Sequence, residues 1–236
     1  MTSADLIVDA FGRIRETVSD TIYGLTPTQL AYRVEVDANP IAWLVWHLTR
    51  IQDDHVAAAF NVPQVWLAGG WAARFGLHAG SMETGYGHNE LEVATLADSV
   101  SLSGLLADYH EATYEQAIKL VSGITEADLD RVVDTSWRPP VTLGVRLVSV
   151  INDSMQHAGQ AAYVRGIVLR TRTAGDYPAG RGHADRPPRR PRPGRRTGGV
   201  PARPQPSGHQ GGSRRRSRSH ARRVEIRPAN RLSRDR

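Results

Sequence analysis

The composition of the chain changes abruptly near residue 170, and this change limits which part of the chain can fold around a core. All five tryptophans and all three phenylalanines lie before residue 140. Residues 171–236 instead contain nine of the 14 prolines, and their larger apolar side chains are Tyr177, Val200, Val224, Ile226 and Leu232. Such a segment buries too little apolar surface to offset the entropy cost of ordering its backbone. We therefore expect one folded domain over residues 1–170 and a disordered basic tail over residues 171–236.

The charges divide at the same point. Residues 1–170 carry 11 basic and 20 acidic side chains, a net charge of −9. Residues 171–236 carry 19 arginines and four acidic side chains, a net charge of +15. The pI of about 10.1 is therefore a property of the tail. Nucleic-acid binding, if the chain has any, is expected through the arginines of the tail alone.

Two origins fit the composition of residues 171–236. A natural, disordered basic tail is one of them. The other is out-of-frame translation of a GC-rich gene, because arginine, proline, glycine and alanine are encoded by codons rich in G and C. The loss of apolar periodicity directly after the last helical segment favours this second origin. A single-base shift near codon 170 that restores an ordinary composition would establish it.

The chain contains no cysteine, which excludes disulfide frameworks, thiolate metal sites and cysteine nucleophiles. The first residues, MTSADLIVDAFGRIRET, interleave charges every few positions and contain no apolar run, so we expect no signal peptide there. No stretch approaches the roughly 20 apolar residues that a membrane-spanning helix needs. We expect a soluble, cytoplasmic protein that does not associate with membranes.

Apolar periodicity predicts four long helices in residues 1–170. The first covers about residues 3–21, and the second begins with Asn39 as its N-cap and Pro40 at its first position, and ends before Pro63. The third covers about residues 103–121, and the fourth about residues 142–170. Residues 64–100 lack periodicity and predict a long crossover loop with one short helix near Gly70. The expected fold class is all-α, a four-helix bundle.

Histidine and aspartate side chains in two of these helices have the spacing of a metal site. Asp153 precedes His157 by four residues, which places a carboxylate and an imidazole on one helix face. His47 lies at the edge of the apolar face of the second helix, so the three groups can converge across the bundle. The spacing alone also fits a surface ion pair between Asp153 and His157, with His47 as a partly buried histidine.

Two sequence segments resemble the signature segments of the DinB-like (YfiT-like) metalloenzyme superfamily. They are NPIAWLVWHLTRIQDDH, residues 39–55, and NDSMQHAGQAAYVRG, residues 152–166. The resemblance extends from residue 1 to about residue 170. It implies a four-helix bundle with a divalent metal held by His47, by His157 and by position 153. That position is aspartate here, where the commonest family pattern has histidine.

The resemblance also implies a chemistry for such a site. Members of the superfamily include transferases and isomerases that use thiols such as mycothiol or bacillithiol. Two imidazoles and one carboxylate with open positions suit catalytic zinc, our first expectation, with iron or nickel as alternatives. The expected function is a mycothiol-type S-transferase or isomerase whose partners are a small thiol and an electrophile. Asp153 is either a direct ligand or a residue that orients an imidazole, and a third alternative is a site that no longer holds metal. A homodimer is compatible with the apolar helix edges.

Other residues have weaker assignments. Trp43 and Trp46 flank His47 and are candidates for a substrate pocket, and His55 either approaches the site or is a core histidine. Asp53 and Asp54 are interpreted as solvated residues or as part of the site mouth, and His110 as an exposed helix residue. Two further functions stay open: a non-catalytic metal-binding stress protein, and nucleic-acid binding through the tail.

Overall fold

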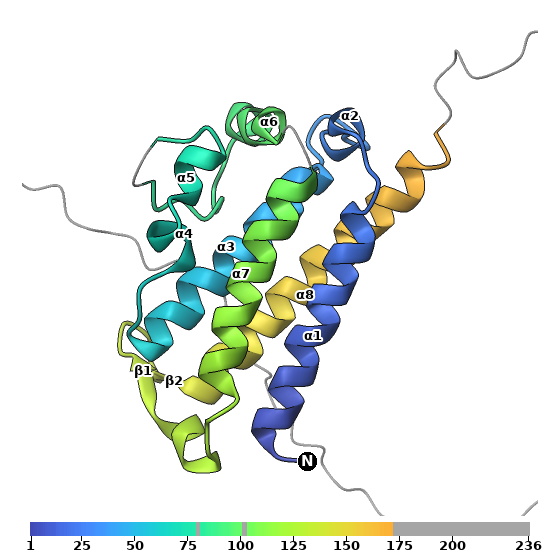
Figure 1. Ribbon diagram of the computed structural model, residues 1–236. Coiled ribbons are helices and arrows are strands. Elements are labelled where there is room, and N and C mark those ends of the chain that lie inside the picture. Colours follow the sequence, from blue (N-terminus) through green and yellow to red (C-terminus); the bar gives the residue numbers. More distant parts are fainter. Residues whose placement is uncertain (79–80, 101–102, 172–236) are drawn as a thin grey trace, which may run out of the picture. The chain divides into compact units, whose positions relative to one another are not determined.

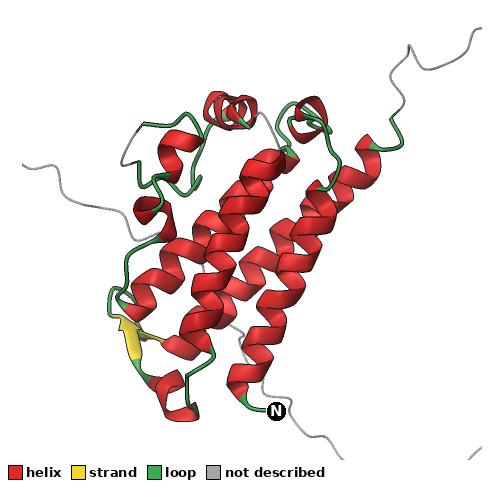
Figure 2. Cartoon of the chain, in the orientation of Figure 1, coloured by secondary structure: helices red, strands yellow, loops and turns green. Residues whose placement is uncertain are grey.

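The computed structural model describes residues 1–78, 81–100 and 103–171 (Figure 1). The predictions for the tail, residues 171–236, therefore fall almost wholly outside the described part of the chain. Four long helices form the body of the described domain: α1 (Ser3–Ile22), α3 (Ile41–Phe60), α7 (Ser103–Val121) and α8 (Leu143–Val168). α1 and α3 each pack against both α7 and α8, and the cartoon shows these helices side by side (Figure 2). The prediction of the all-α fold class is confirmed, because the described domain is mostly helical, and the bounds of the four long helices were predicted to within two residues.

α3 is the most deeply buried of the long helices. Every side chain from Ile41 to Arg50 is buried, because α7, α8 and the crossover segment cover this helix on several sides. The N-cap is Pro40, in an extended conformation, and not Asn39 as expected. Proline has no side chain that can accept a hydrogen bond, so this end of the helix has no side-chain cap.

The crossover between α3 and α7 has more structure than predicted. It contains the short helices α4 (Val65–Ala68) and α5 (Trp71–Arg74), and the ten-residue α6 (Glu90–Ser99). α6 begins with a capping box: Asn89 accepts from the backbone N–H of Glu92, whose carboxylate accepts from the N–H of Asn89. The prediction of a loop with one short helix was therefore wrong, although the capping box is readable in the sequence.

The remaining elements are short. They are α2 (Pro27–Leu30), a 3-10 helix (Glu126–Asp130), and a small antiparallel hairpin of β1 (Val132–Asp134) and β2 (Val141–Thr142). The hairpin was not expected from the sequence. It leads directly into α8, whose N-cap Thr142 accepts a hydrogen bond from the backbone N–H of Val145. None of the helices in the described ranges is long and apolar enough to cross a membrane.

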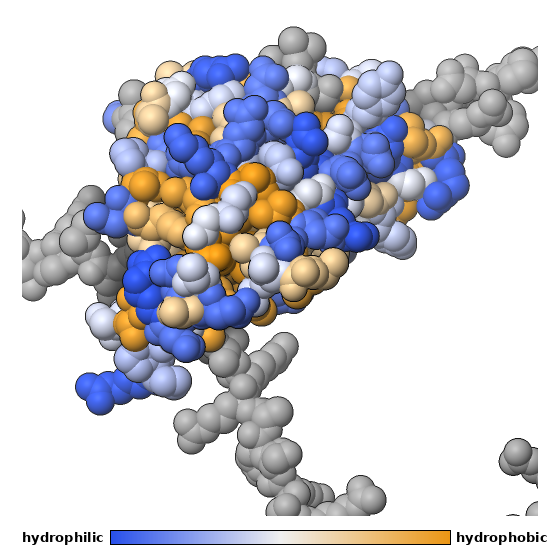
Figure 3. Space-filling view, turned by 60° about the horizontal axis from the view of Figure 1, so that its bottom comes forward, coloured by the Kyte–Doolittle hydropathy of each residue, from blue (hydrophilic) through white to orange (hydrophobic). Residues whose placement is uncertain are grey.

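Several apolar side chains remain exposed on α8. Val145, Val148, Met155 and Tyr163 are each about half exposed or more. Figure 3 shows apolar residues gathered in the middle of one face of the domain, within a mostly polar surface. Large contiguous apolar patches are typical of interaction surfaces, whereas apolar side chains exposed singly are common on soluble proteins. The homodimer suggested by the sequence stays a prediction.

His110 is buried, which contradicts its interpretation as an exposed residue. Its imidazole is 2% exposed and lies between α7 and α3, with Nδ1 3.0 Å from Oγ1 of Thr49. The Thr49 hydroxyl donates to the carbonyl of Val45, so its oxygen accepts the Nδ1–H of His110. Burial lowers the pKa of His110 to about 4.

The buried His110 is expected to make the metal-free protein less stable in acid. Its pKa lies below the unfolded value of about 6.5, so the unfolded state binds more protons between these two values. The free energy of unfolding should therefore fall by about 3 kcal/mol as the pH drops from 6.5 to 4. Urea titrations with a chelator present, on wild type and His110→Gln, isolate this contribution. If the free energy of unfolding falls equally with pH in both proteins, the prediction is wrong.

Candidate metal centre

The structure brings together the three residues that the sequence singled out as ligands. His47 comes from α3, and Asp153 and His157 lie one turn apart on α8. Each offers one ligand atom, and these atoms all lie within 4.8 Å of one another. His47 is buried, and the other two side chains are about one-quarter exposed or less, so the cluster opens toward solvent from the α8 side.

The His47 ring is held in one orientation by the backbone and by a tryptophan. Its Nδ1 is hydrogen-bonded to the carbonyl oxygen of Thr84, and because a carbonyl only accepts, Nδ1 carries the proton. Nε2 is then left with a free lone pair, as a metal ligand requires. The ring of Trp43 stacks on the imidazole, with centroids 4.5 Å apart and planes 13° apart. Burial lowers the pKa of His47 to about 4, so the ring is neutral at pH 7.

The α8 side of the cluster repeats this pattern. Nδ1 of His157 lies 2.9 Å from the side-chain oxygen Oε1 of Gln160, to which it donates. Nε2 of His157 faces Asp153 Oδ1 at 3.7 Å. The other carboxylate oxygen of Asp153, Oδ2, is buried and has no hydrogen-bond partner among the described residues. Burial raises the pKa of Asp153, and the neighbouring His157 partly opposes this effect.

Taken together, the polar atoms of the cluster are acceptors without a donor between them. Both Nδ1 protons are donated outward, to Thr84 and to Gln160. Two imidazole lone pairs and a carboxylate therefore face one another. A cation satisfies such a set of acceptors.

The two tryptophans flanking His47 have different positions. Trp43 lies against the cluster, stacked on His47 and edge-on to His157 with centroids 6.4 Å apart. Its indole Nε1–H donates to Nδ1 of His88 at 3.3 Å. Trp46 stacks instead on His88, with ring centroids 5.7 Å apart. Of the two tryptophans, Trp43 is therefore the one whose ring contacts both His47 and His157 among the described residues.

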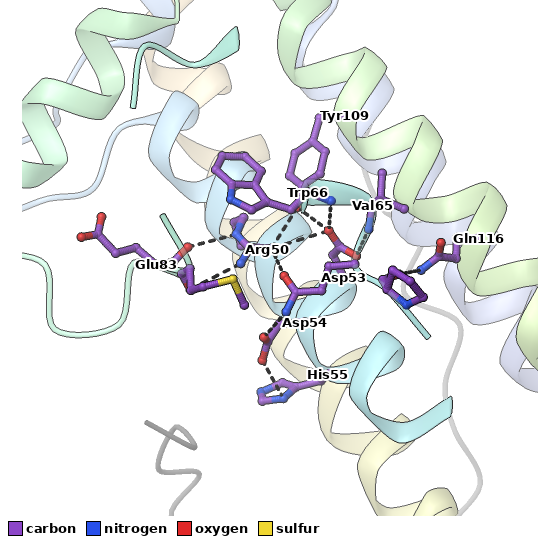
Figure 4. Close-up of polar contacts among 12 residues, drawn as sticks. Arg50, Asp53, Asp54, His55, Val65, Trp66, Glu83, Tyr109 and Gln116 are labelled. Carbon is purple, nitrogen blue, oxygen red and sulfur yellow. Dashed lines mark hydrogen bonds and ion pairs between the residues drawn. The ribbon is translucent and has the colours of Figure 1, made fainter. Parts of the chain in front are cut away.

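His55 and the two aspartates beside it lie away from the cluster. His55 pairs with Asp54 at 3.5 Å and belongs to a separate polar group lower on α3 (Figure 4). Asp53 is 2% exposed, so its interpretation as a solvated residue was wrong. Its carboxylate accepts hydrogen bonds from the backbone N–H groups of Val65 and Trp66 and from the Tyr109 hydroxyl.

Sequence reasoning missed the crossover residues that surround His47. Residues 81–88, which we call the site loop, contribute the Thr84 carbonyl, His88 and Gly85. Gly85 has φ of +91°, and a Cβ added there would lie 2.8 Å from Trp46 Cζ3 and 3.0 Å from His47 Nδ1. The only signal for this contact was the glycine itself, since glycine suits positive φ and close approach.

Comparisons with known proteins agree with this fold and with the sequence resemblance. A family model described as mycothiol S-transferase matches residues 6–169. A solved structure, described as the conserved protein of locus from Enterococcus faecalis, is 30% identical, with a TM-score of 0.65. The match covers 72% of this chain and 98% of that one. No curated protein matches. Because the family model spans most of the chain, the chain belongs to the mycothiol S-transferase family, within the DinB-like superfamily.

Proposed function

We propose that this protein is a divalent-metal-dependent S-transferase that joins mycothiol to an electrophilic small molecule. The observation that carries the proposal is the convergence of His47, Asp153 and His157, whose ligand atoms lie within 4.8 Å of one another. The family membership supplies the thiol and the class of reaction. The proposed ligands are the two imidazole Nε2 atoms and the Asp153 carboxylate.

The donor set fits a cation on chemical grounds. Each imidazole has its Nδ1 proton engaged, by a backbone carbonyl for His47 and by Gln160 for His157. Metal-bound histidines are commonly oriented in this way. The buried Oδ2 of Asp153 has no hydrogen-bond partner among the described residues, which leaves it available to a cation. Two histidines and one carboxylate leave coordination positions for a substrate, and zinc is the first expectation.

In the proposed reaction the thiol loses its proton and its sulfur forms a bond to the electrophilic carbon. The leaving group departs with the electron pair of the bond that breaks. A divalent cation at this site would stabilise the thiolate and lower the pKa of the thiol. The chain's own residues orient His47 and His157 through hydrogen bonds to their Nδ1 atoms, and Trp43 covers one side of the cluster with an apolar surface.

Cobalt substitution tests the proposal. Protein loaded with Co²⁺ should bind about one ion per chain, and mycothiol should change its visible spectrum by adding a sulfur-to-cobalt band. Consumption of a chromogenic electrophile should then require mycothiol, with glutathione and cysteine compared at equal concentration. Cobalt binding with no spectral response to any thiol would support a non-catalytic metal-binding protein instead. Absence of metal binding would refute both.

A further inference from the structure

A buried arginine lies one helical turn after His47 on α3. Arg50 is fully buried, and its guanidinium uses its donors on groups from outside α3 (Figure 4). Nε donates to the carbonyl of Glu83 at 3.0 Å, and Nη2 lies 3.5 Å from the carbonyl of Met82. Nη1 donates to the side-chain oxygen of Gln64 at 3.1 Å and to the Tyr109 hydroxyl at 3.2 Å. Arg50 thus joins α3 to the site loop and to α7.

The charge of Arg50 is compensated within the core. Asp53 Oδ2 lies 3.5 Å from Nη1 and is also buried. A buried ion pair of this kind adds little net stability, because removing both charges from water costs about as much as their attraction returns. We therefore look for the role of Arg50 in the directions of its hydrogen bonds. The planar guanidinium donates in several fixed directions at once, which a lysine ammonium does not reproduce.

Arg50 and its neighbour Trp66 donate hydrogen bonds to consecutive backbone carbonyls of the site loop. The Trp66 indole N–H donates to the carbonyl of Ser81 at 2.7 Å, and the Arg50 guanidinium lies over the Trp66 ring, 4.7 Å from its centroid. With Arg50 on Met82 and Glu83, three successive carbonyls are held. The next carbonyl along the chain, that of Thr84, accepts the Nδ1–H of His47.

We propose that Arg50 is a positioning residue for His47, acting through the site loop. By holding the carbonyls of Met82 and Glu83, it places the Thr84 carbonyl where it selects the Nδ1–H form of His47 and leaves Nε2 free toward Asp153 and His157. Among the described residues, Arg50 is not one of those that offer a ligand atom to the cluster. The inference rests on the proposed metal site for its consequence, although the orientation of His47 can be measured without a metal.

The test compares Arg50→Lys with Arg165→Lys. Arg165 is a matched control, because it also holds two backbone carbonyls, those of Thr21 and Tyr23, but at the end of α1. In metal-free protein at pH 7.5, long-range proton–nitrogen spectra of the imidazoles report which nitrogen of His47 is protonated. Wild type and Arg165→Lys should show the Nδ1–H form, and Arg50→Lys a mixture of both forms. Zinc affinity should fall by about 10- to 100-fold in Arg50→Lys and stay within about threefold in the control.

Each outcome has one meaning. Folded Arg50→Lys with the wild-type His47 form and the wild-type zinc affinity would overturn the inference. If wild type binds no zinc, the proposed function fails, while the imidazole spectra still decide the role of Arg50. Should Arg50→Lys not fold, Trp66→Phe replaces it, since phenylalanine keeps an aromatic ring and removes the donor to Ser81 together with part of the ring volume. An unchanged His47 spectrum in that variant would likewise count against the inference.

Discussion

His157→Ala is expected to lower the affinity for zinc or cobalt by more than about 100-fold, beyond the cost of losing an outer-shell partner. The substitution removes one of the three converging groups, so that only His47 and Asp153 remain to hold the cation. Mycothiol-dependent consumption of the electrophile should fall with the metal content. Metal analysis after dialysis and calorimetric titration measure the first effect, and the initial rate at saturating thiol measures the second.

His55→Ala provides the control for that experiment. His55 is also a largely buried histidine on α3, but it pairs with Asp54 and lies outside the ligand cluster. Its replacement should leave metal affinity within a few-fold of wild type. Equal losses in His55→Ala and His157→Ala would show that the metal is held elsewhere. Full retention of metal and of rate in His157→Ala would remove the basis of the proposed function.

Gly85→Ala is expected to destabilise the protein and disturb the metal site together. The new methyl group would lie 2.8 Å from Trp46, 3.0 Å from Trp43 and 3.0 Å from His47 Nδ1. The backbone also has φ of +91°, which alanine adopts only with strain. Overpacking and strain together should lower the free energy of unfolding by about 2–5 kcal/mol. Denaturant unfolding of metal-free protein and metal titration of the folded fraction measure the two effects.

Gly87→Ala separates the close contact from the backbone strain. Gly87 also has positive φ, +76°, but a Cβ there would meet no atom within 4 Å. Its replacement should cost only about 1–2 kcal/mol and leave metal affinity unchanged. If the two substitutions have the same effect on both measurements, the packing of Gly85 against the His47 ring is not what matters.

The long helices were predictable because each presents an apolar stripe over many turns. Phe11, Ile14 and Val18 in α1 show the spacing and are all buried. The crossover gave no comparable signal, since α4 and α5 are only four residues long and cannot display a period. α6 was missed for a different reason. Its apolar pattern is weak, and its start is marked only by the capping box of Asn89 and Glu92.

The candidate ligands could be predicted in part. Asp153 and His157 share a helix face by spacing alone. The approach of His47 was inferred from its place at the edge of the apolar face of α3, and the family resemblance supported this inference. The site loop could not be foreseen, because its main contribution is a backbone carbonyl, which any residue type carries. Asp53 and His110 were placed on the surface because polar residues usually lie there. Both are instead buried with specific partners, Arg50 and Thr49.

The order of the proposed ligands along the chain has a consequence for folding. His47 belongs to an early helix, while Asp153 and His157 belong to the last long helix of the domain. A chain still being synthesised therefore carries a single histidine of the set until α8 has emerged and docked on α3. Since a cation that binds only the native state stabilises it by mass action, metal uptake would come last and would secure the contact between these two helices. If the proposed site holds a metal, metal content would then report whether α8 has docked on α3.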